Sequence, residues 1–147
     1  MTPRVVESDV IRRRLRLMED SLRDLRLLAD QTAEDLAATP LYRAAAERLI
    51  QVVVDLAVDI NSHLAVAGGA PAPETGRDSF PAAAAVGALT DDLARRLAPS
   101  AGLRNLLVHR YADIRLDLLT VGIAATLADY PVYIREISTY LLSADDG

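Results

Sequence analysis

Residues 49–64 are apolar on nearly every face that a helix would present to its surroundings. A helix of this kind has to be covered on all sides to be stable in water. The few other helices of one small domain can hardly enclose it completely. We therefore predict that one face of this segment packs against a second copy of the chain, so that the protein is a homodimer.

The rest of the chain also shows helical periodicity. Apolar residues between Val10 and Leu36 recur mostly at steps of three and four, and no segment has the alternation of a half-buried strand. The chain has 147 residues, 51% of them hydrophobic, which suits one domain with a real core. The sequence predicts an all-α fold in a single domain over residues 1–147, an up-and-down bundle of two or three long helices plus short helices.

Capping residues and prolines mark the ends of the two N-terminal helices. The first is expected to begin with a cap at Ser8 or Asp9 and to end near Thr39. Pro40 suits the first turn of the second helix, because its missing N–H costs nothing there. This second helix is expected to run to about Ala67.

Glycines and prolines after the second helix predict a loop over residues 68–79. The later helices are expected at residues 79–88, from a cap at Thr90 to before Pro99, at residues 100–109 and at residues 113–142, the last beginning at Asp113. Because Pro131 lies within the last of these, we expect a kink or a restart near Asp129.

The charge balance is acidic, and every basic residue is an arginine. The 16 basic and 21 acidic residues give a net charge of −5, which argues against non-specific coating of nucleic acid. Arginines nevertheless outnumber acidic residues between positions 12 and 26. This segment is either an ordinary solvated helix face or a local phosphate-binding patch.

Several classes of site have no support in the sequence. The absence of Cys removes disulfides, thiolate metal sites and cysteine nucleophiles. Gly68 and Gly69 are not followed by the Lys and Ser or Thr of a phosphate-binding loop, and the histidines form no His-Glu-x-x-His arrangement. We expect no metal and no cofactor. With no membrane-spanning run and no signal-peptide pattern, we expect a soluble, cytoplasmic protein with no membrane partner.

Residues 102–111 concentrate polar groups with chemical capacity. Arg104 offers a planar fork of donors suited to a phosphate, and His109 can take or give a proton near neutral pH. Five positions separate the two, so they converge only because Arg is long or because the helix loosens near its end. Asn105 lies one helical turn from His109, and Tyr111 adds a hydroxyl. The alternative is a helix C-terminus with a cationic cap.

Two carboxylates lie one turn apart within the apolar segment. Asp55 and Asp59 share a helix face, so they could serve a site or could pair with an arginine from a neighbouring helix. We favour the pairing.

The pattern Arg104-Asn105-x-x-x-His109-x-Tyr111 resembles the signature of the HepT-like ribonuclease toxins of the HEPN superfamily. The resemblance extends upstream, since residues 46–64 are similar to the second helix of that family. Pro73-Glu74-Thr75 and Phe80 follow in the expected order. The resemblance covers residues 10–142.

This resemblance implies a homodimeric helical bundle that is the toxin of a two-gene module. The antitoxin partner would resemble a minimal nucleotidyltransferase, and the activity would be metal-independent cleavage of RNA, with tRNA among the targets. Arg104 and His109 carry over as catalytic residues, Tyr111 as the position that the antitoxin modifies with AMP, and Asn105 as a supporting residue. The candidate contacts to RNA phosphates are Arg12, Arg13, Arg16, Arg110 and Arg115.

Two other functions remain open from the sequence. The chain could be a non-catalytic helical binding module that docks on a nucleotidyltransferase partner. It could also be a purely structural dimer, in which case Arg104 and His109 would be satisfied in the interior instead of facing a cleft.

Overall fold

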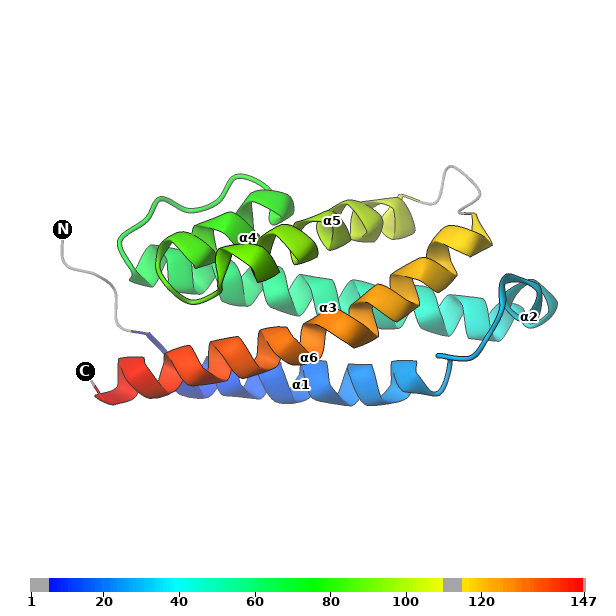
Figure 1. Cartoon of the computed structure of the whole chain (residues 1–147), viewed down its shortest axis with the longest axis horizontal. Helices are drawn as coiled ribbons and strands as arrows, with labels where there is room; N and C mark the ends of the chain where they lie inside the picture. The colour runs from blue at the N-terminus through cyan, green and yellow to red at the C-terminus, as the bar shows by residue number, and fades with distance from the viewer. Residues whose placement is uncertain (1–5, 110–114, 147) are drawn as a thin grey trace.

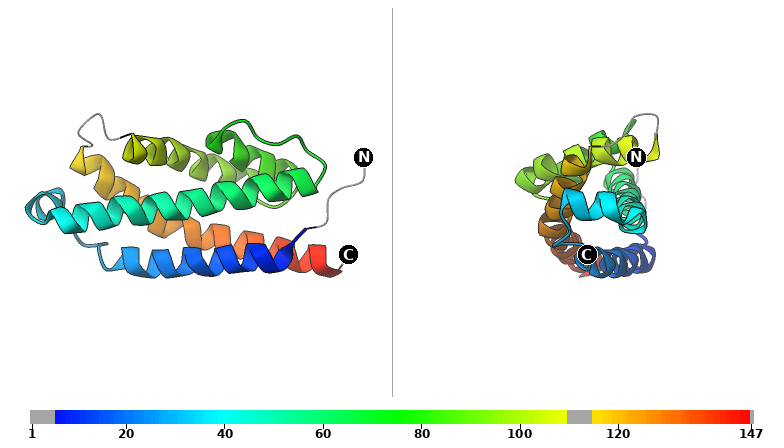
Figure 2. Two further views of the ribbon diagram at one scale, coloured as in Figure 1. Left: turned by 180° about the vertical axis from the view of Figure 1, so that it is seen from behind. Right: turned by 90° about the vertical axis from the view of Figure 1, so that its right-hand side faces the viewer.

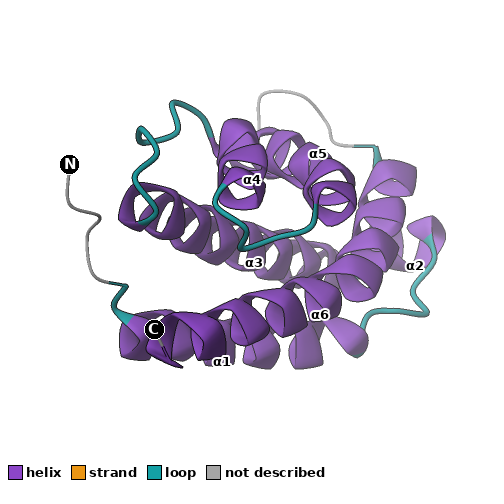
Figure 3. Cartoon of the chain, turned by 60° about the vertical axis from the view of Figure 1, so that its left-hand side comes forward, coloured by secondary structure: helices purple, strands orange, loops and turns teal. Residues whose placement is uncertain are grey.

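A computed structural model describes residues 6–109 and 115–146 of the chain. These residues form six helices and no strand, which confirms the predicted all-α fold (Figures 1 and 3). The helices are α1 (Ser8–Arg26), α2 (Ala33–Ala38), α3 (Pro40–Ala67), α4 (Gly76–Ala85), α5 (Asp91–Val108) and α6 (Leu116–Asp146).

Seen from behind, the long helix α3 lies in front of the other long helices and runs along most of the bundle (Figure 2). It contacts all five of the other helices, with α1 and α6 along one side and α4 and α5 along the other. The start of α1 lies beside the end of α6, where Ser8 Oγ and Asp145 Oδ1 are 2.6 Å apart. The start of α6 lies at the opposite end of the bundle, near the end of α5 (Figure 1).

One chain encloses most of the apolar segment of α3. Ile50, Val53, Ile60 and Leu64 are fully buried, and no large hydrophobic side chain between residues 49 and 64 is among the exposed ones. Helices α1 and α6 cover one side of α3, and α4 and α5 cover another. The segment is not enclosed completely, as expected, because Leu49, Val52, Leu56 and Val58 are only partly buried. That a second copy of the chain covers this face stays a prediction.

Among the described helices, α3 alone is long and apolar enough to cross a membrane, with a mean hydropathy of 1.5 over its most apolar window. This corrects the expectation that no segment meets that criterion. The same window is 44% buried inside the bundle, and α3 packs against every other helix, as the core helix of a globular domain does.

The first predicted helix is interrupted. It ends at Arg26, and a turn leads into the separate helix α2. Thr32 caps α2 by accepting from Asp35 N at 3.1 Å, while Thr32 N donates to Asp35 Oδ2 at 2.9 Å. This reciprocal capping box starts a new helix where the apolar periodicity alone suggested continuation. Ser8 and Asp9 do not cap α1, because its N-cap is Glu7, whose side chain makes no capping hydrogen bond.

Two boundaries near α4 and α5 also differ from expectation. Helix α4 is capped by Thr75, whose Oγ1 accepts from Asp78 N at 3.1 Å, so the preceding loop ends earlier than predicted. Helix α5 is continuous through Pro99, where two helices were expected. Burial of Leu97 and Ala101 on either side offsets the hydrogen bond that proline removes.

Helix α6 likewise continues through Pro131 without a restart and reaches Asp146. The expected start of this helix at Asp113 lies outside the described residues. The second helix has the predicted bounds: Pro40 occupies its first turn, and it ends at Ala67 before Gly68. Gly69 then adopts a φ of 90°, a left-handed conformation that favours glycine.

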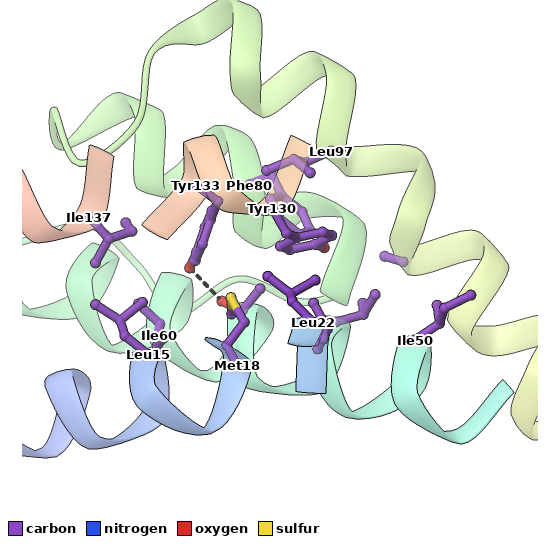
Figure 4. Packing of buried hydrophobic residues seen from close by; sticks show 14 of the residues in the cluster. Leu15, Met18, Leu22, Ile50, Ile60, Phe80, Leu97, Tyr130, Tyr133 and Ile137 are labelled. Atoms are coloured by element: carbon purple, nitrogen blue, oxygen red, sulfur yellow. Dashed lines mark hydrogen bonds between the residues drawn. The ribbon is translucent and has the colours of Figure 1, made fainter. Parts of the chain in front are cut away.

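A buried polar network fixes α3 against α4 and α6. Tyr133 donates from its hydroxyl to Asn61 Oδ1 at 2.7 Å, and Asn61 Nδ2 donates to Ser79 Oγ at 3.1 Å. Tyr133 packs against Tyr130 in the core, with ring centroids 5.7 Å apart (Figure 4). Burial raises the pKa of both phenols, that of Tyr133 well above its ordinary value, so both stay neutral donors. The network holds the part of α3 that follows Asp55 in a single register.

Candidate active site

Arg104 of α5 is held by Asp55 of α3. Its Nε donates to Asp55 Oδ1 at 2.6 Å, and its Nη2 donates to Asp55 Oδ2 at 3.3 Å. This is the two-bond geometry in which a guanidinium and a carboxylate bind most strongly. The two side chains remain 30% and 41% exposed, respectively. The structure confirms the predicted pairing of Asp55 with an arginine of a neighbouring helix, and it identifies that arginine as the one in the motif.

Asn105 lies beside this pair on the solvent side of α5. Its Oδ1 accepts from Arg104 Nη1 at 3.4 Å, a long hydrogen bond. Its backbone oxygen accepts from His109 N at 3.0 Å in the last turn of the helix. Asn105 thus touches both residues of the predicted catalytic pair.

His109 ends α5. It is the C-cap residue, with φ −90° and ψ 51°, and it is exposed to solvent. Within the described residues, no hydrogen bond links its imidazole to Arg104, whose guanidinium faces Asp55 instead. One chain therefore presents the two groups at the same end of the same helix but does not join them. Arg110 and Tyr111 lie outside the described residues.

The other arginines predicted to contact RNA are spread over the surface. Arg115 binds Asp117 through Nε at 3.1 Å and Nη2 at 2.6 Å, and the hydrogen bond from Arg115 lowers the pKa of Asp117. Arg12 binds Asp145 at 2.6 Å. Arg13 and Arg16 are exposed.

The start of α1, which carries Arg12, and the end of α5, which carries the motif, lie at opposite ends of the bundle (Figure 1). Arg12, bound to Asp145, marks the end of the bundle where α1 begins and α6 ends. His109 lies at the other end, where α5 stops and α6 starts. The structure therefore does not bring Arg12, Arg13 and Arg16 together with His109 in one chain.

Apolar side chains are exposed beside the motif. Leu106 and Val108 of α5 and Leu118 and Val121 of α6 are 56%, 39%, 47% and 65% exposed. We call these four residues the α5–α6 face. A cavity of about 280 Å³ runs between the two helices. They approach closely at Gly122, where an added Cβ would lie 2.6 Å from Leu103 Cδ2. The sequence analysis did not identify this face, because it did not separate the exposed apolar residues of α5 and α6 from the buried ones.

In the described part of the chain, neither Asp59 nor His63 forms a hydrogen bond or an ion pair with Arg104. Asp59 is exposed and has no ion-pair partner among the residues that the structure describes. His63 accepts a hydrogen bond at Nε2 from Glu7 N at 3.3 Å, which ties the start of α1 to α3. In the described part of the chain, no group of three or more His, Asp and Glu side chains is arranged to bind a metal ion.

Comparison with known proteins gives a consistent result. The sequence profile of the family described as "Ribonuclease HepT-like" matches residues 18–137. The tRNA nuclease HepT of Aphanizomenon flos-aquae is 32% identical over 141 residues, which cover 96% of each chain. The mRNA nuclease HepT of Shewanella oneidensis is 30% identical over 88 residues, covering 60% of this chain and 66% of that protein.

Solved structures share the fold at lower identity. One is a toxin–antitoxin complex with AMP-PNP, with a TM-score of 0.79 and 20% identity. Another is the tri-AMPylated HEPN toxin of Shewanella oneidensis in complex with MNT antitoxin, with a TM-score of 0.79 and 21% identity. Each match covers 89% of this chain and 98% of the matched chain.

Proposed function

Because the chain belongs to the HepT-like ribonuclease family, we propose that it is an endoribonuclease toxin that cleaves tRNA with Arg104 and His109. The observation that carries this proposal is the end of α5, where an exposed imidazole follows a guanidinium that is already held in place. An exposed His109 can reach a bound RNA, and the part of Arg104 that Asp55 does not cover can bind a phosphate. For this activity we propose a location in the cytoplasm.

The proposed reaction uses the 2′-hydroxyl of the RNA itself. A neutral imidazole takes the proton of this hydroxyl while its oxygen bonds to the adjacent phosphorus. The bond from phosphorus to the 5′-oxygen breaks, and a protonated imidazole gives its proton to that leaving oxygen. Arg104 donates hydrogen bonds to the phosphate oxygens, which carry the extra negative charge of the transition state. The products are a 2′,3′-cyclic phosphate and a 5′-hydroxyl, and no metal ion takes part.

This reaction needs a base and an acid, whereas each chain has one histidine in the motif. A homodimer supplies both if the two motifs face one cleft. The α5–α6 face supports such a dimer, because it is apolar, exposed and continuous with the motif. Burying Leu118 and Val121 against a second copy would bring the ends of the two α5 helices together. We propose α5 and α6 as the dimer surface, whereas the sequence alone favoured the apolar segment of α3.

The proposed contacts to RNA extend from this cleft. Arg110 follows His109 in the sequence. Arg115 precedes α6, and among the described residues it has donors left beyond those that Asp117 accepts. Arg12, Arg13 and Arg16 lie in the first half of α1 and would contact RNA away from the cleaved bond. Asn105 supports the site by contacting Arg104.

The proposed antitoxin is a minimal nucleotidyltransferase that transfers AMP from ATP to the hydroxyl of Tyr111 and releases pyrophosphate. AMP on this tyrosine would add bulk and negative charge two positions after His109, and it would exclude RNA by steric block and repulsion. We expect the wild-type chain, incubated with the antitoxin and ATP, to gain AMP by mass spectrometry and to lose cleavage. The Tyr111→Phe variant is expected to gain no AMP and to keep its activity. AMP on another residue of that variant would contradict the assignment.

The direct test of the activity is incubation of the purified full-length chain with total tRNA in the presence of EDTA. We expect discrete cleavage products with EDTA at the same rate as without it. Intact tRNA in both reactions would refute tRNA cleavage, and loss of cleavage only in EDTA would refute the metal-free reaction. A non-catalytic binding module would leave the tRNA intact.

A further inference from the structure

The motif arginine receives its most specific contact from a residue outside the motif. Asp55 lies 49 positions earlier in the chain, on helix α3, which packs against α5. Both of its carboxylate oxygens accept hydrogen bonds from Arg104. The contact crosses between α3 and α5, and the polar network around Asn61 fixes the part of α3 that follows. Asp55 is therefore anchored by the core, and Arg104 is anchored by Asp55.

The geometry of the pair decides which part of the guanidinium can bind a ligand. A guanidinium has five N–H donors in one plane. Asp55 occupies the edge formed by Nε and Nη2, and Asn105 accepts weakly from Nη1. The edge between Nη1 and Nη2, at the end of the side chain, remains available to a ligand. We call it the end edge. A phosphate can bind along this edge through two parallel N–H donors.

We propose that Asp55 is a positioning residue of the nuclease site, one that aims the end edge of Arg104 at the phosphate of the bound RNA. This inference rests on the proposed function, because it concerns the same reaction. Asp55 touches neither the RNA nor the reacting atoms. It acts through Arg104, by limiting the rotations of a long side chain before the substrate arrives.

Asp55 also opposes the attraction between Arg104 and RNA in the ground state. Its negative charge partly neutralises the guanidinium and repels a phosphate at short range. Loss of this charge is therefore expected to leave the Michaelis constant for RNA unchanged or to lower it. Loss of the orientation is expected to lower the turnover number, because the donors no longer meet the charge that develops in the transition state.

The test measures initial rates of tRNA cleavage by the full-length dimer over a range of tRNA concentrations. For Asp55→Asn we expect kcat to fall about tenfold without a rise in KM, because a misplaced donor costs rate and not binding. Asp55→Ser, which replaces the carboxylate with a shorter hydroxyl, is expected to give the same result and serves if the Asn variant does not fold. Asp55→Glu keeps the carboxylate and is expected to lose no more than about threefold in kcat.

Asp59→Asn is the matched control. It makes the same change of charge on the same helix, one turn later, at an exposed side chain without an ion-pair partner among the described residues. We expect its kcat and KM to stay within about twofold of the wild-type values. An equal loss of kcat in this variant would mean that the charge of α3 matters and the contact with Arg104 does not.

An Arg104→Lys background separates positioning from a structural role. An ammonium has no planar fork for Asp55 to orient, so Asp55→Asn is expected to change kcat by less than about twofold in this background. If Asp55 only stabilises the fold, the same substitution will cost about tenfold in both backgrounds. Thermal unfolding of each variant gives the folded fraction for correcting kcat.

The outcomes distinguish this inference from the proposed function. If Arg104→Lys and His109→Ala cleave poorly while Asp55→Asn keeps the wild-type kcat, the role of Asp55 is wrong and the nuclease site stands. If Arg104→Lys and His109→Ala cleave like the wild type, or if the wild type does not cleave, the proposed site fails and the role of Asp55 fails with it.

Discussion

Replacing His109 with Ala is expected to slow RNA cleavage by about 10³-fold or more, because the reaction loses the group that moves both protons. A positioned acid or base contributes about 10² to 10⁴ in rate, and in a symmetric dimer one substitution removes both imidazoles. The fold is expected to survive, since His109 is an exposed residue at the end of α5. Initial rates on tRNA and growth of cells that express the variant both measure the effect.

The chain offers one other histidine as a control. His63 accepts a hydrogen bond from Glu7 N and lies within α3, away from the end of α5. His63→Gln is expected to keep the cleavage rate within about twofold, because a glutamine can still accept this bond. Cleavage by His109→Ala at the wild-type rate would remove His109 from the mechanism. Loss of activity in His63→Gln alone would place the reaction elsewhere.

Replacing Val121 with Arg is expected to produce a monomer that cleaves RNA at least about 100-fold more slowly. Val121 is the most exposed member of the α5–α6 face, so the change leaves the core of the monomer untouched. A charge buried in an apolar contact between two copies opposes association strongly. A monomer retains one motif histidine and therefore lacks either the acid or the base. Light scattering after size-exclusion chromatography gives the mass, and tRNA cleavage gives the rate.

A second exposed apolar site provides the matched control for this variant. Leu27, in the turn after α1, is 80% exposed and adjoins a separate apolar groove that includes Leu41 and Tyr42. Leu27→Arg is expected to remain dimeric and to keep its activity within about twofold. A monomeric Leu27→Arg together with a dimeric Val121→Arg would move the dimer surface to that groove. A monomer of Val121→Arg with full activity would refute the composite cleft.

Much of the fold follows from local patterns in the sequence. Apolar residues at helical spacing predict the helices, and Pro40 and Gly68 place the ends of α3 correctly. The periodicity did not predict the break after Arg26, although Thr32 and Asp35 have the sequence spacing of a capping box. Continuity through Pro99 and Pro131 was not predictable in this way, because the helix on both sides of each proline is stabilised by contacts with distant residues.

The candidate site was likewise predictable only in part from the sequence. The motif identifies Arg104 and His109 by their spacing within one helix. Their surroundings depend on which helices meet, and local spacing carries no information on this. The sequence predicted that Asp55 pairs with an arginine, but only the packing of α3 against α5 selects Arg104. The exposed position of Val121 depends on packing for the same reason.

The most direct test of the account is the chemistry of the RNA ends that the wild-type protein produces in EDTA. Attack by the 2′-hydroxyl predicts that every upstream fragment ends in a 2′,3′-cyclic phosphate and every downstream fragment begins with a 5′-hydroxyl. Mass spectrometry of the fragments and their labelling by polynucleotide kinase without prior dephosphorylation detect these two ends. Fragments that carry a 3′-hydroxyl and a 5′-phosphate would contradict the account, because they require attack by water and a different set of catalytic groups.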